Sequence, residues 1–276
     1  MNRVALSLGA GGAQAILPRQ KALLVRCSPM LNKLYIGFDK DIKPPKGGFL
    51  FIDDEVPDIP RARIFDPAKH SFNPLKNIDY KKAREVADIL YTVSPQGENT
   101  LTVRNGKRSL LAMLLEGKER LDKLGAGSGA GAVEAAETVN DVLASPVLRR
   151  VLCNPTNFSF NPRSVILARV NRAELGDFDA LVLGLLLMAQ YKGTVCVPDF
   201  GFYGRDLHAS LIRQNRLIAG VYTLAELSPK LRQNVLLIRD KVPCGTTFED
   251  AVILARYKKL EQSTVGFNDF VKEALG

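Results

Sequence analysis

The second half of the chain alternates short apolar runs with longer amphipathic ones. We expect strands at residues 164–170, 194–198, 217–222 and 235–239, and helices at residues 177–190, 206–214, 228–234 and 248–257, the last capped by Thr247. Strands that alternate with helices of this length form βαβ units on a parallel sheet. Because the strands are almost continuously apolar, helices should cover both faces of the sheet. The pattern therefore predicts a three-layer α/β fold with a mainly parallel sheet flanked by helices.

The first half of the chain is less regular. Residues 1–62 form an irregular N-terminal region, broken by Gly and Pro, with strand-like runs at residues 22–26 and 49–53. A short strand is expected at residues 62–65. Three apolar helical stripes follow, at residues 80–90 behind an N-cap at Asp79, at 110–121 and at 139–151. We expect residues 1–276 to form a single α/β domain.

A glycine- and alanine-rich segment, residues 125–132, separates the second stripe from the third. None of its side chains can bury much area, so we interpret it as a flexible linker and expect it to be exposed and mobile. Either it is natural, or an engineered sequence has replaced a longer loop. No Lys-Ser/Thr pair follows its glycines, which argues against a phosphate-binding role.

The net charge and the content of cysteine and histidine indicate which kinds of partner and site to expect. The net charge of +9 favours acidic partners, of which nucleic acid is the commonest. The four cysteines form no C-x-x-C pair and only two histidines are present, so we expect no metal site. Isolated cysteines in apolar surroundings favour a reducing compartment, and the longest apolar run is too short to span a membrane. We therefore expect a soluble cytoplasmic protein.

Basic residues gather on two of the predicted helices. They are Lys81, Lys82, Arg84, Arg149 and Arg150. Such a set could contact the phosphates of double-stranded DNA. The alternative is a solvated helix face, and no aromatic residues interleave with the charges to stack on bases.

Five segments share their order and turn residues with a known group of motors. They are Ile64-Phe-Asp-Pro67 with Ser71-Phe-Asn-Pro-Leu75, residues 164–190 with Arg172-Ala-Glu-Leu-Gly-Asp177, Thr194-Val-Cys-Val-Pro-Asp199, Arg213-Gln-Asn-Arg216 with Ala219-Gly-Val-Tyr-Thr223, and residues 231–257. These segments resemble the motor domain of the HerA–FtsK group of DNA-pumping ATPases, in particular conjugative coupling proteins and related packaging ATPases. The resemblance covers most of the chain from Ala62 onward. It implies a RecA-like core of the P-loop NTPase type.

The phosphate-binding loop of such motors is missing from the sequence. A P-loop needs Gly-x-x-x-x-Gly-Lys-Ser/Thr, so that backbone N–H groups can surround the phosphates. The nearest match contains Gly106 and Lys107, but Leu101 stands in place of the first glycine and Arg108 in place of the hydroxyl residue. A strand at residues 100–103 could lead into this loop. The alternative is a turn before an amphipathic helix.

The resemblance places Asp199 at the end of the Walker B strand, where it would hold the water shell of Mg²⁺; the alternative is a strand-end carboxylate that caps a loop. The motors carry a catalytic Glu at the next position, which orients the attacking water, whereas this chain has Phe200. Arg213 and Arg216 could act as arginine fingers on a neighbour's nucleotide, or they could be surface residues. We assign no catalytic residue.

These observations favour a catalytically degenerate relative of DNA-translocating ATPases. It would be a DNA-associated or assembly subunit in DNA packaging or transfer by a phage or mobile element, as a homo-oligomer or as a partner of an active ATPase. A second hypothesis is an active ATPase with a non-standard phosphate loop at Gly106 and Lys107, which would use ATP and Mg²⁺. A third is a structural oligomerisation protein that binds no nucleotide.

Overall fold

The computed structural model describes residues 32–37, 47–94, 100–116, 120–124, 129–214, 216–238, 240–244 and 246–261. The chain falls into two compact units. The first contains Met1–Phe51, Pro162–Val165 and Gly193–Gly276, and the second contains Ile52–Asn161 and Ile166–Lys192. The single domain expected from the sequence stays a prediction.

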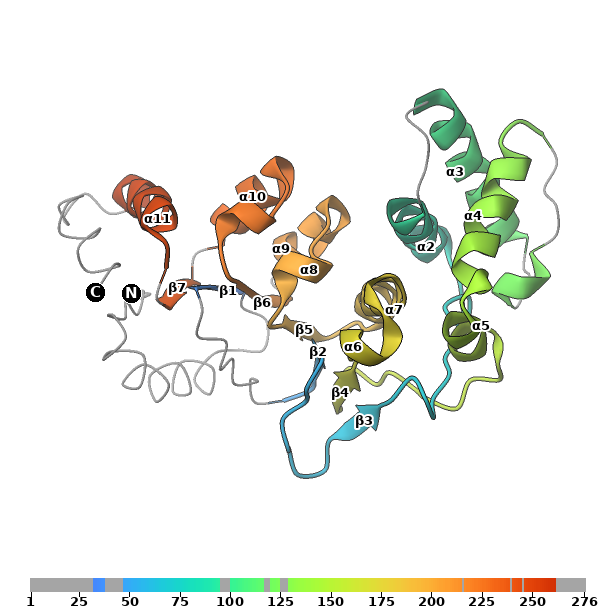
Figure 1. Ribbon diagram of the computed structural model, residues 1–276, viewed down its shortest axis with the longest axis horizontal. Coiled ribbons are helices and arrows are strands. Elements are labelled where there is room, and N and C mark those ends of the chain that lie inside the picture. Colours follow the sequence, from blue (N-terminus) through green and yellow to red (C-terminus); the bar gives the residue numbers. More distant parts are fainter. Residues whose placement is uncertain are drawn as a thin grey trace. The chain divides into compact units, whose positions relative to one another are not determined.

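The strands form one seven-stranded parallel sheet (Figure 1), which confirms the predicted α/β class. They are β1 (Lys33–Gly37), β2 (Phe49–Asp53), β3 (Arg63–Phe65), β4 (Val165–Arg169), β5 (Thr194–Val197), β6 (Leu217–Val221) and β7 (Asp240–Cys244). Their order in the sheet is β3-β4-β2-β5-β6-β1-β7. All residues of β5 and β6 are buried, as expected of parallel strands covered on both faces.

The helices of the first unit are α8 (Phe200–Tyr203), α9 (Ala209–Arg213), α10 (Pro229–Leu236) and α11 (Phe248–Glu261), with short 3-10 turns η2 (Asp206–His208) and η3 (Leu224–Glu226). All four α-helices lie on the same side of strands β5, β6, β1 and β7 (Figure 1). Hydroxyl side chains cap the starts of α10 and α11. The Ser228 hydroxyl accepts a hydrogen bond from the Leu231 N–H at 3.1 Å, and Thr247 accepts one from the Asp250 N–H at 3.2 Å.

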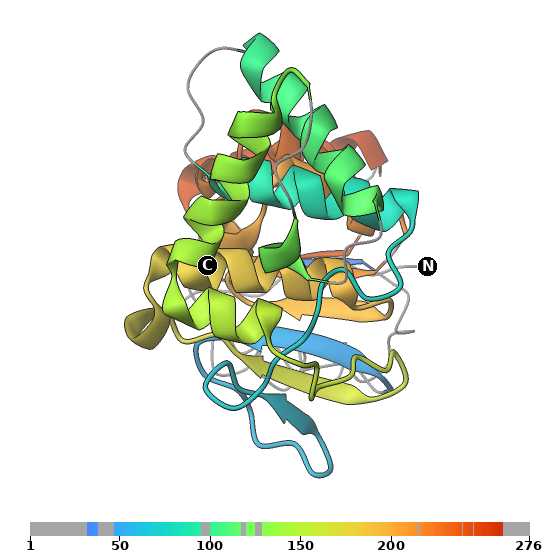
Figure 2. The same ribbon diagram turned by 90° about the vertical axis from the view of Figure 1, so that its right-hand side faces the viewer.

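The second unit contains α2 (Tyr80–Val93), α3 (Thr100–Leu115), α4 (Ala132–Ala144), α5 (Pro146–Cys153), α6 (Arg172–Leu175), α7 (Asp177–Gln190) and the 3-10 turn η1 (Leu121–Lys123). Figure 2 shows this unit from the front, with α2 packed between α3 and α7. Helix α7 is apolar on nearly all sides and is buried from Ala180 to Ala189, apart from the half-buried Leu181. Asp79 caps α2 as predicted, since its carboxylate accepts a hydrogen bond from the Lys82 N–H at 2.7 Å.

The structure corrects several boundaries. The strand expected at residues 235–239 is wrong, because Val235 and Leu236 end α10 and the strand begins at Asp240. The strand expected at residues 100–103 is also wrong, since this stretch begins α3. Strand β1 was not predicted, and the run at residues 22–26 lies outside the described residues. The helix expected at residues 206–214 is a 3-10 turn followed by the short α9.

The third apolar stripe belongs to two helices. Ser145 and Pro146 divide it, because Pro146 lacks the N–H that would continue α4 and occupies the first turn of α5 instead. Ser145 caps α5 by accepting a hydrogen bond from the Leu148 N–H at 3.2 Å.

The glycine-rich segment is described only from Gly129 onward. Gly129 and Ala130 are exposed, as expected, whereas Ala132 is buried and begins α4. Gly131 has a φ of 89°, and a Cβ atom there would lie 2.4 Å from the backbone of Asn105 and Gly106 in α3. This end of the segment is therefore packed closely, and its role as a linker stays a prediction.

Candidate functional site

The carboxyl ends of parallel strands are where α/β proteins usually bind ligands. Asp199, the predicted Mg²⁺ residue, stands two positions after β5 and immediately before α8. Only 7 % of it is exposed, and the residue interacts with other residues of the chain. The sequence therefore placed this carboxylate correctly at the carboxyl edge. Mg²⁺ binding by it stays a prediction.

Phe200, the next residue, belongs to the hydrophobic core. It is fully buried in α8, and its ring lies 5.8 Å from the imidazole of His208. Burial first, and the charge of Arg205 second, lower the pKa of His208 to about 3. Its Nδ1 atom accepts a hydrogen bond from the Arg205 N–H at 3.0 Å, so the ring is neutral and Nε2 carries the proton. The position at which the motors carry a water-orienting Glu is thus a packing position in this chain.

A carboxylate that the sequence reasoning did not single out lies beside this position. Glu226 of η3 accepts a hydrogen bond from the Tyr222 N–H at 3.3 Å. A Cβ atom at Gly201 would lie 2.0 Å from the Glu226 Oε2 atom, so this carboxylate packs directly against α8. Thr223-Leu-Ala-Glu226 has the spacing of a capping box, which was the available signal. In the described part of the chain, no three His, Cys, Asp or Glu side chains form a group that could hold a metal ion.

Gly106 and Lys107, the nearest match to a P-loop, lie in the middle of α3. Backbone N–H groups inside a helix bond to the carbonyl four residues earlier, so they are not available to surround a phosphate. A Cβ atom at Gly106 would lie 2.1 Å from the Tyr91 hydroxyl oxygen of α2, and the Lys107 ammonium pairs with Asp88 at 2.9 Å. Both residues thus contribute to the packing of α3 on α2. Nucleotide binding by them stays a prediction.

The two predicted arginine fingers have different surroundings. Arg213 is exposed at the end of α9. Arg216 directly precedes β6, so it lies at the amino edge of the sheet, opposite to the edge of Asp199. Its Nε donates a hydrogen bond to the Gly193 carbonyl at 2.9 Å and its Nη1 donates one to Gln214 at 3.0 Å. A role of either residue on a neighbour's nucleotide stays a prediction.

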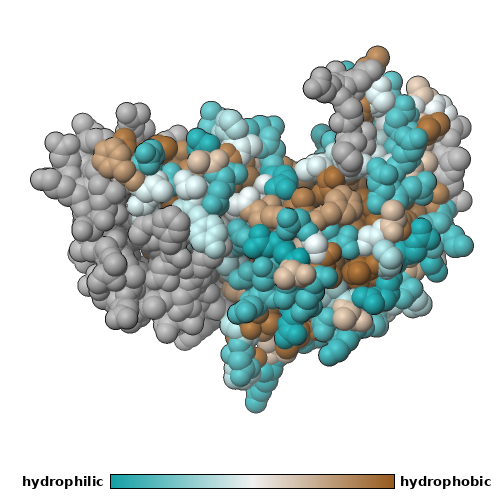
Figure 3. All heavy atoms as spheres, in the orientation of Figure 1, coloured by the Kyte–Doolittle hydropathy of each residue, from teal (hydrophilic) through white to brown (hydrophobic). Residues whose placement is uncertain are grey.

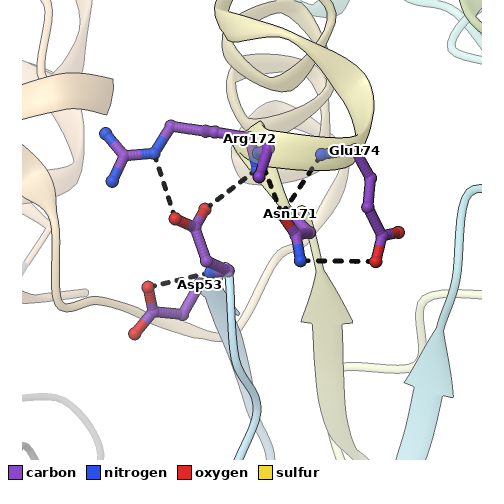
Figure 4. A network of polar contacts seen from close by, with 6 residues as sticks. Asp53, Asn171, Arg172 and Glu174 are labelled. Atoms are coloured by element: carbon purple, nitrogen blue, oxygen red, sulfur yellow. Dashed lines mark hydrogen bonds and ion pairs between the residues drawn. The ribbon is translucent and has the colours of Figure 1, made fainter.

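The carboxyl ends of β2 and β4 carry a closed polar network in the second unit (Figure 4). Asp54 accepts hydrogen bonds from the Arg172 backbone N–H and from its Nε atom, both at 3.2 Å. Asn171 caps α6 by accepting bonds from the N–H groups of Ala173 and Glu174 at 2.9 and 3.3 Å. The Asp54 carboxylate is therefore neutralised within the fold by Arg172 and fixes the start of α6.

The predicted DNA-binding residues lie on α2 and α5. Lys81 and Arg84 are exposed, whereas Lys82 is half-buried and its ammonium donates a hydrogen bond to the Lys76 carbonyl at 2.7 Å. Burial, and then the charge of Lys192, lower the pKa of Lys82. Lys81 and Arg84 are thus the cations of α2 most available to a ligand.

Arg149 and Arg150 are exposed on α5 but anchored to the backbone. Arg149 donates from Nε to the Leu143 carbonyl at 3.0 Å, and Arg150 from Nη2 to the Pro67 carbonyl at 2.9 Å. A guanidinium held by a neutral carbonyl keeps its full charge and its other donors.

None of the helices in the described ranges is both long enough and apolar enough to cross a membrane. A scan of protein-family models and a search of curated proteins found no match to the sequence.

Solved structures, in contrast, resemble the chain. The plasmid coupling protein TrwB, in complex with a non-hydrolysable GTP analogue, has a TM-score of 0.53 at 12 % identity, over 88 % of this chain and 80 % of that one. Unbound TrwBΔN70, a bacterial conjugative coupling protein, has a TM-score of 0.55 at 11 % identity, over 89 % and 79 %. TrwB with ADP and Mg²⁺ has a TM-score of 0.51 at 12 % identity, over 93 % and 82 %. The chain therefore has the fold of a conjugative coupling protein, as its resemblance to such motors in sequence had predicted.

Proposed function

We propose that this chain is a DNA-associated subunit with the fold of a DNA-translocating ATPase, and that it does not hydrolyse ATP by itself. It acts in the transfer or packaging of double-stranded DNA by a phage or mobile element. It does so as a homo-oligomer or beside an active ATPase that supplies the energy.

Two observations support the DNA part of this proposal. The solved structures that resemble the chain are those of conjugative coupling proteins. The chain also carries a net charge of +9, which favours sequence-independent binding to phosphates.

The main support for the proposed loss of catalysis is the burial of Phe200, the residue directly after Asp199. Phosphoryl transfer depends on a cradle for the phosphates and on a polar group that orients the nucleophile. The sequence contains no Gly-x-x-x-x-Gly-Lys-Ser/Thr motif, and the ring at position 200 is fully enclosed by the core. The missing phosphate-loop motif and the apolar ring at position 200 support the proposal that the chain does not hydrolyse ATP by itself.

Steady-state phosphate release tests the catalytic part. The purified chain, with and without double-stranded DNA, should release phosphate no faster than buffer with ATP and Mg²⁺. Turnover near about 1 per second that disappears in Lys107→Ala would refute the proposal and establish the non-standard phosphate loop. Turnover that Lys107→Ala leaves unchanged would also contradict the proposal, once an unrelated protein purified in parallel shows none.

Fluorescence anisotropy with labelled duplexes tests the DNA part. Binding should weaken steeply between 50 and 200 mM salt (about a fourfold range) and differ little between unrelated sequences, since phosphate contacts carry no sequence information. Arg149→Ala with Arg150→Ala should weaken binding to every duplex alike. Absence of binding at low salt would remove DNA from the proposal and favour a purely structural role.

A further inference from the structure

Two segments of the second unit, residues 61–78 and 146–161, are joined by hydrogen bonds along their length. The first contains β3 and the connection to α2, and the second contains α5 and its connection toward β4 (Figures 1 and 2). Ser71 bonds to the Pro155 carbonyl at 2.6 Å and to the Asn157 side chain at 2.8 Å, and the Asn73 N–H bonds to Thr156 at 3.0 Å. We call these segments the basic loop pair.

The basic loop pair concentrates the positive charge of the molecule. It contains six Lys or Arg residues and a single acidic residue, Asp66, for a net charge of +5, compared with +9 for all 276 residues. The six cations are all exposed: Arg61, Arg63, Lys69, Lys76, Arg149 and Arg150. More than half of the net charge therefore lies on two adjoining segments, which composition alone could not show.

Most of these cations are not neutralised by the fold. Within the described residues, only Lys69 among the six forms an ion pair with a carboxylate. Its ammonium lies 3.8 Å from Asp66, and the lysine side chain is 76 % exposed. Arg63 donates from Nη1 to the carbonyl and the hydroxyl of Ser159, at 2.9 and 3.1 Å. Arg150 donates to the Pro67 carbonyl. Neutral oxygens orient these guanidinium groups without cancelling their charge, which leaves the charge for an external anion.

An aromatic cluster holds the two segments together. Phe65 and Phe72 of one segment pack edge-to-face with each other, with centroids 5.7 Å apart, and Phe65 meets Phe158 of the other segment at 5.3 Å. The Arg63 guanidinium lies over the Phe158 ring, 4.6 Å from its centroid. Because Phe65, Phe72 and Phe158 are all at least 95 % buried, the cations are carried by a packed platform and not by free loops.

Arg63, Lys69 and Arg150 are linked through neighbouring residues of the two segments. Arg63 contacts Ser159, Arg150 contacts Pro67, and the Lys69 carbonyl accepts a hydrogen bond from Asn157 at 3.1 Å. Exposed amide and hydroxyl groups at Thr156, Asn157 and Ser159 stand among them. Such groups commonly donate to phosphate oxygens beside Arg and Lys.

We propose that the basic loop pair binds the phosphodiester backbone of double-stranded DNA and is the main DNA-contacting surface of this chain. This inference rests on the proposed DNA association and adds its location, which includes Arg61, Arg63, Lys69 and Lys76 besides the two arginines of α5. Contacts of this kind position the duplex and do not read its sequence.

The experiment compares two triple variants of the full chain by anisotropy with duplex DNA over a series of salt concentrations. One is Arg63→Gln, Lys69→Gln, Arg150→Gln in the basic loop pair. The matched control is Arg104→Gln, Arg108→Gln, Lys123→Gln, which removes three exposed cations of the same unit outside the loop pair. Arg104 and Arg108 belong to α3. The face of the molecule drawn in Figure 3 carries both hydrophilic and hydrophobic areas.

The loop-pair variant should bind every duplex more weakly, and the slope of log K against log salt should fall in magnitude by about 2.7, or about 0.9 for each lost phosphate contact. The control should keep the slope and affinity of the wild type. A second variant, Arg61→Gln, Lys69→Gln, Lys76→Gln, avoids the arginines that bond to backbone carbonyls and should lower the slope in the same direction. Thermal unfolding shows whether each variant is folded.

The outcomes separate the two proposals. If the wild type binds DNA and the loop-pair variant and the matched control weaken binding equally, or neither weakens it, the loop pair is not the DNA surface and the proposed function stands. If the wild type does not bind DNA at low salt, the loop-pair proposal falls together with the DNA part of the proposed function.

Discussion

Replacing Gly131 by Ala should destabilise the second unit far more than the same change at Gly129. Both glycines have positive φ, 89° at Gly131 and 101° at Gly129. An L-residue in this region costs about 1–2 kcal/mol, and this cost applies to both positions. A Cβ atom at Gly129 would meet nothing within 4 Å, whereas one at Gly131 would lie 2.4 Å from two backbone atoms of α3.

The contact distance sets the difference between the two variants. Real Cβ atoms do not approach other heavy atoms this closely, so α3 and the start of α4 must move apart. Overpacking of this kind typically costs about 1–3 kcal/mol. Gly131→Ala should therefore lower the free energy of unfolding by about 2–5 kcal/mol in total, and Gly129→Ala by only about 1–2 kcal/mol.

Urea unfolding followed by circular dichroism measures both values on the same chain. If the free energies of unfolding of the two variants agree within about 0.5 kcal/mol, which is the usual range for surface substitutions, the close approach of Gly131 to α3 is refuted. The whole glycine-rich segment would then behave as the linker expected from its composition.

Three further predictions concern the carboxyl edge of the sheet and its surroundings. His208 is held neutral with a pKa of about 3 against 6.5 in the unfolded chain, so the stability it contributes above pH 6.5 is lost as the pH falls toward 3. Urea unfolding at pH 6.5 and pH 5 should show the wild type losing about 2 kcal/mol more than His208→Asn, and equal losses would contradict the neutral state. Phe200→Glu should create no ATP turnover and should lower the free energy of unfolding by at least about 3 kcal/mol, with Phe200→Leu as a milder control, because a carboxylate would replace a buried ring. A double-mutant cycle of Asp54→Ala and Arg172→Ala should give a coupling of about 0.5–1 kcal/mol that weakens with salt, and zero coupling at low salt would show that the pair contributes nothing.

Local signals in the sequence predicted those elements whose ends carry their own chemistry. Asp79 and Thr247 cap helices where expected, and the apolar helix at residues 177–190 has the predicted bounds. A helix cap depends only on residues within one turn of the helix. It can therefore be predicted from the local sequence, without knowledge of the tertiary structure.

Features that depend on tertiary contacts were not predictable. Strand β1 was not predicted because it contains Lys33, a residue type that is normally exposed. Only the fold shows that this lysine is fully buried. The apolar run ending at Ile238 resembled a strand more than Asp240-Lys-Val-Pro-Cys244 did, although the latter is β7.

The candidate site was predictable only in part. The sequence located Asp199 at a strand end, but it could not show that Glu226 packs against Gly201. Nor could it show that Gly106 serves helix packing. Each of these glycines contacts a residue 15 or more positions away in the chain. A local sequence pattern therefore cannot predict the contact.

The two outermost strands among the described residues differ from ordinary edge strands in ways that affect strand pairing. An unpaired strand edge invites a strand from another molecule, and short length, charge and proline are the usual protections. Strand β3, at one end of the order, has only three residues and presents the exposed Arg63; β7, at the other end, contains Pro243, which has no N–H to donate. Among the described strands, both ends of the sheet therefore carry features that disfavour pairing with a strand of another molecule.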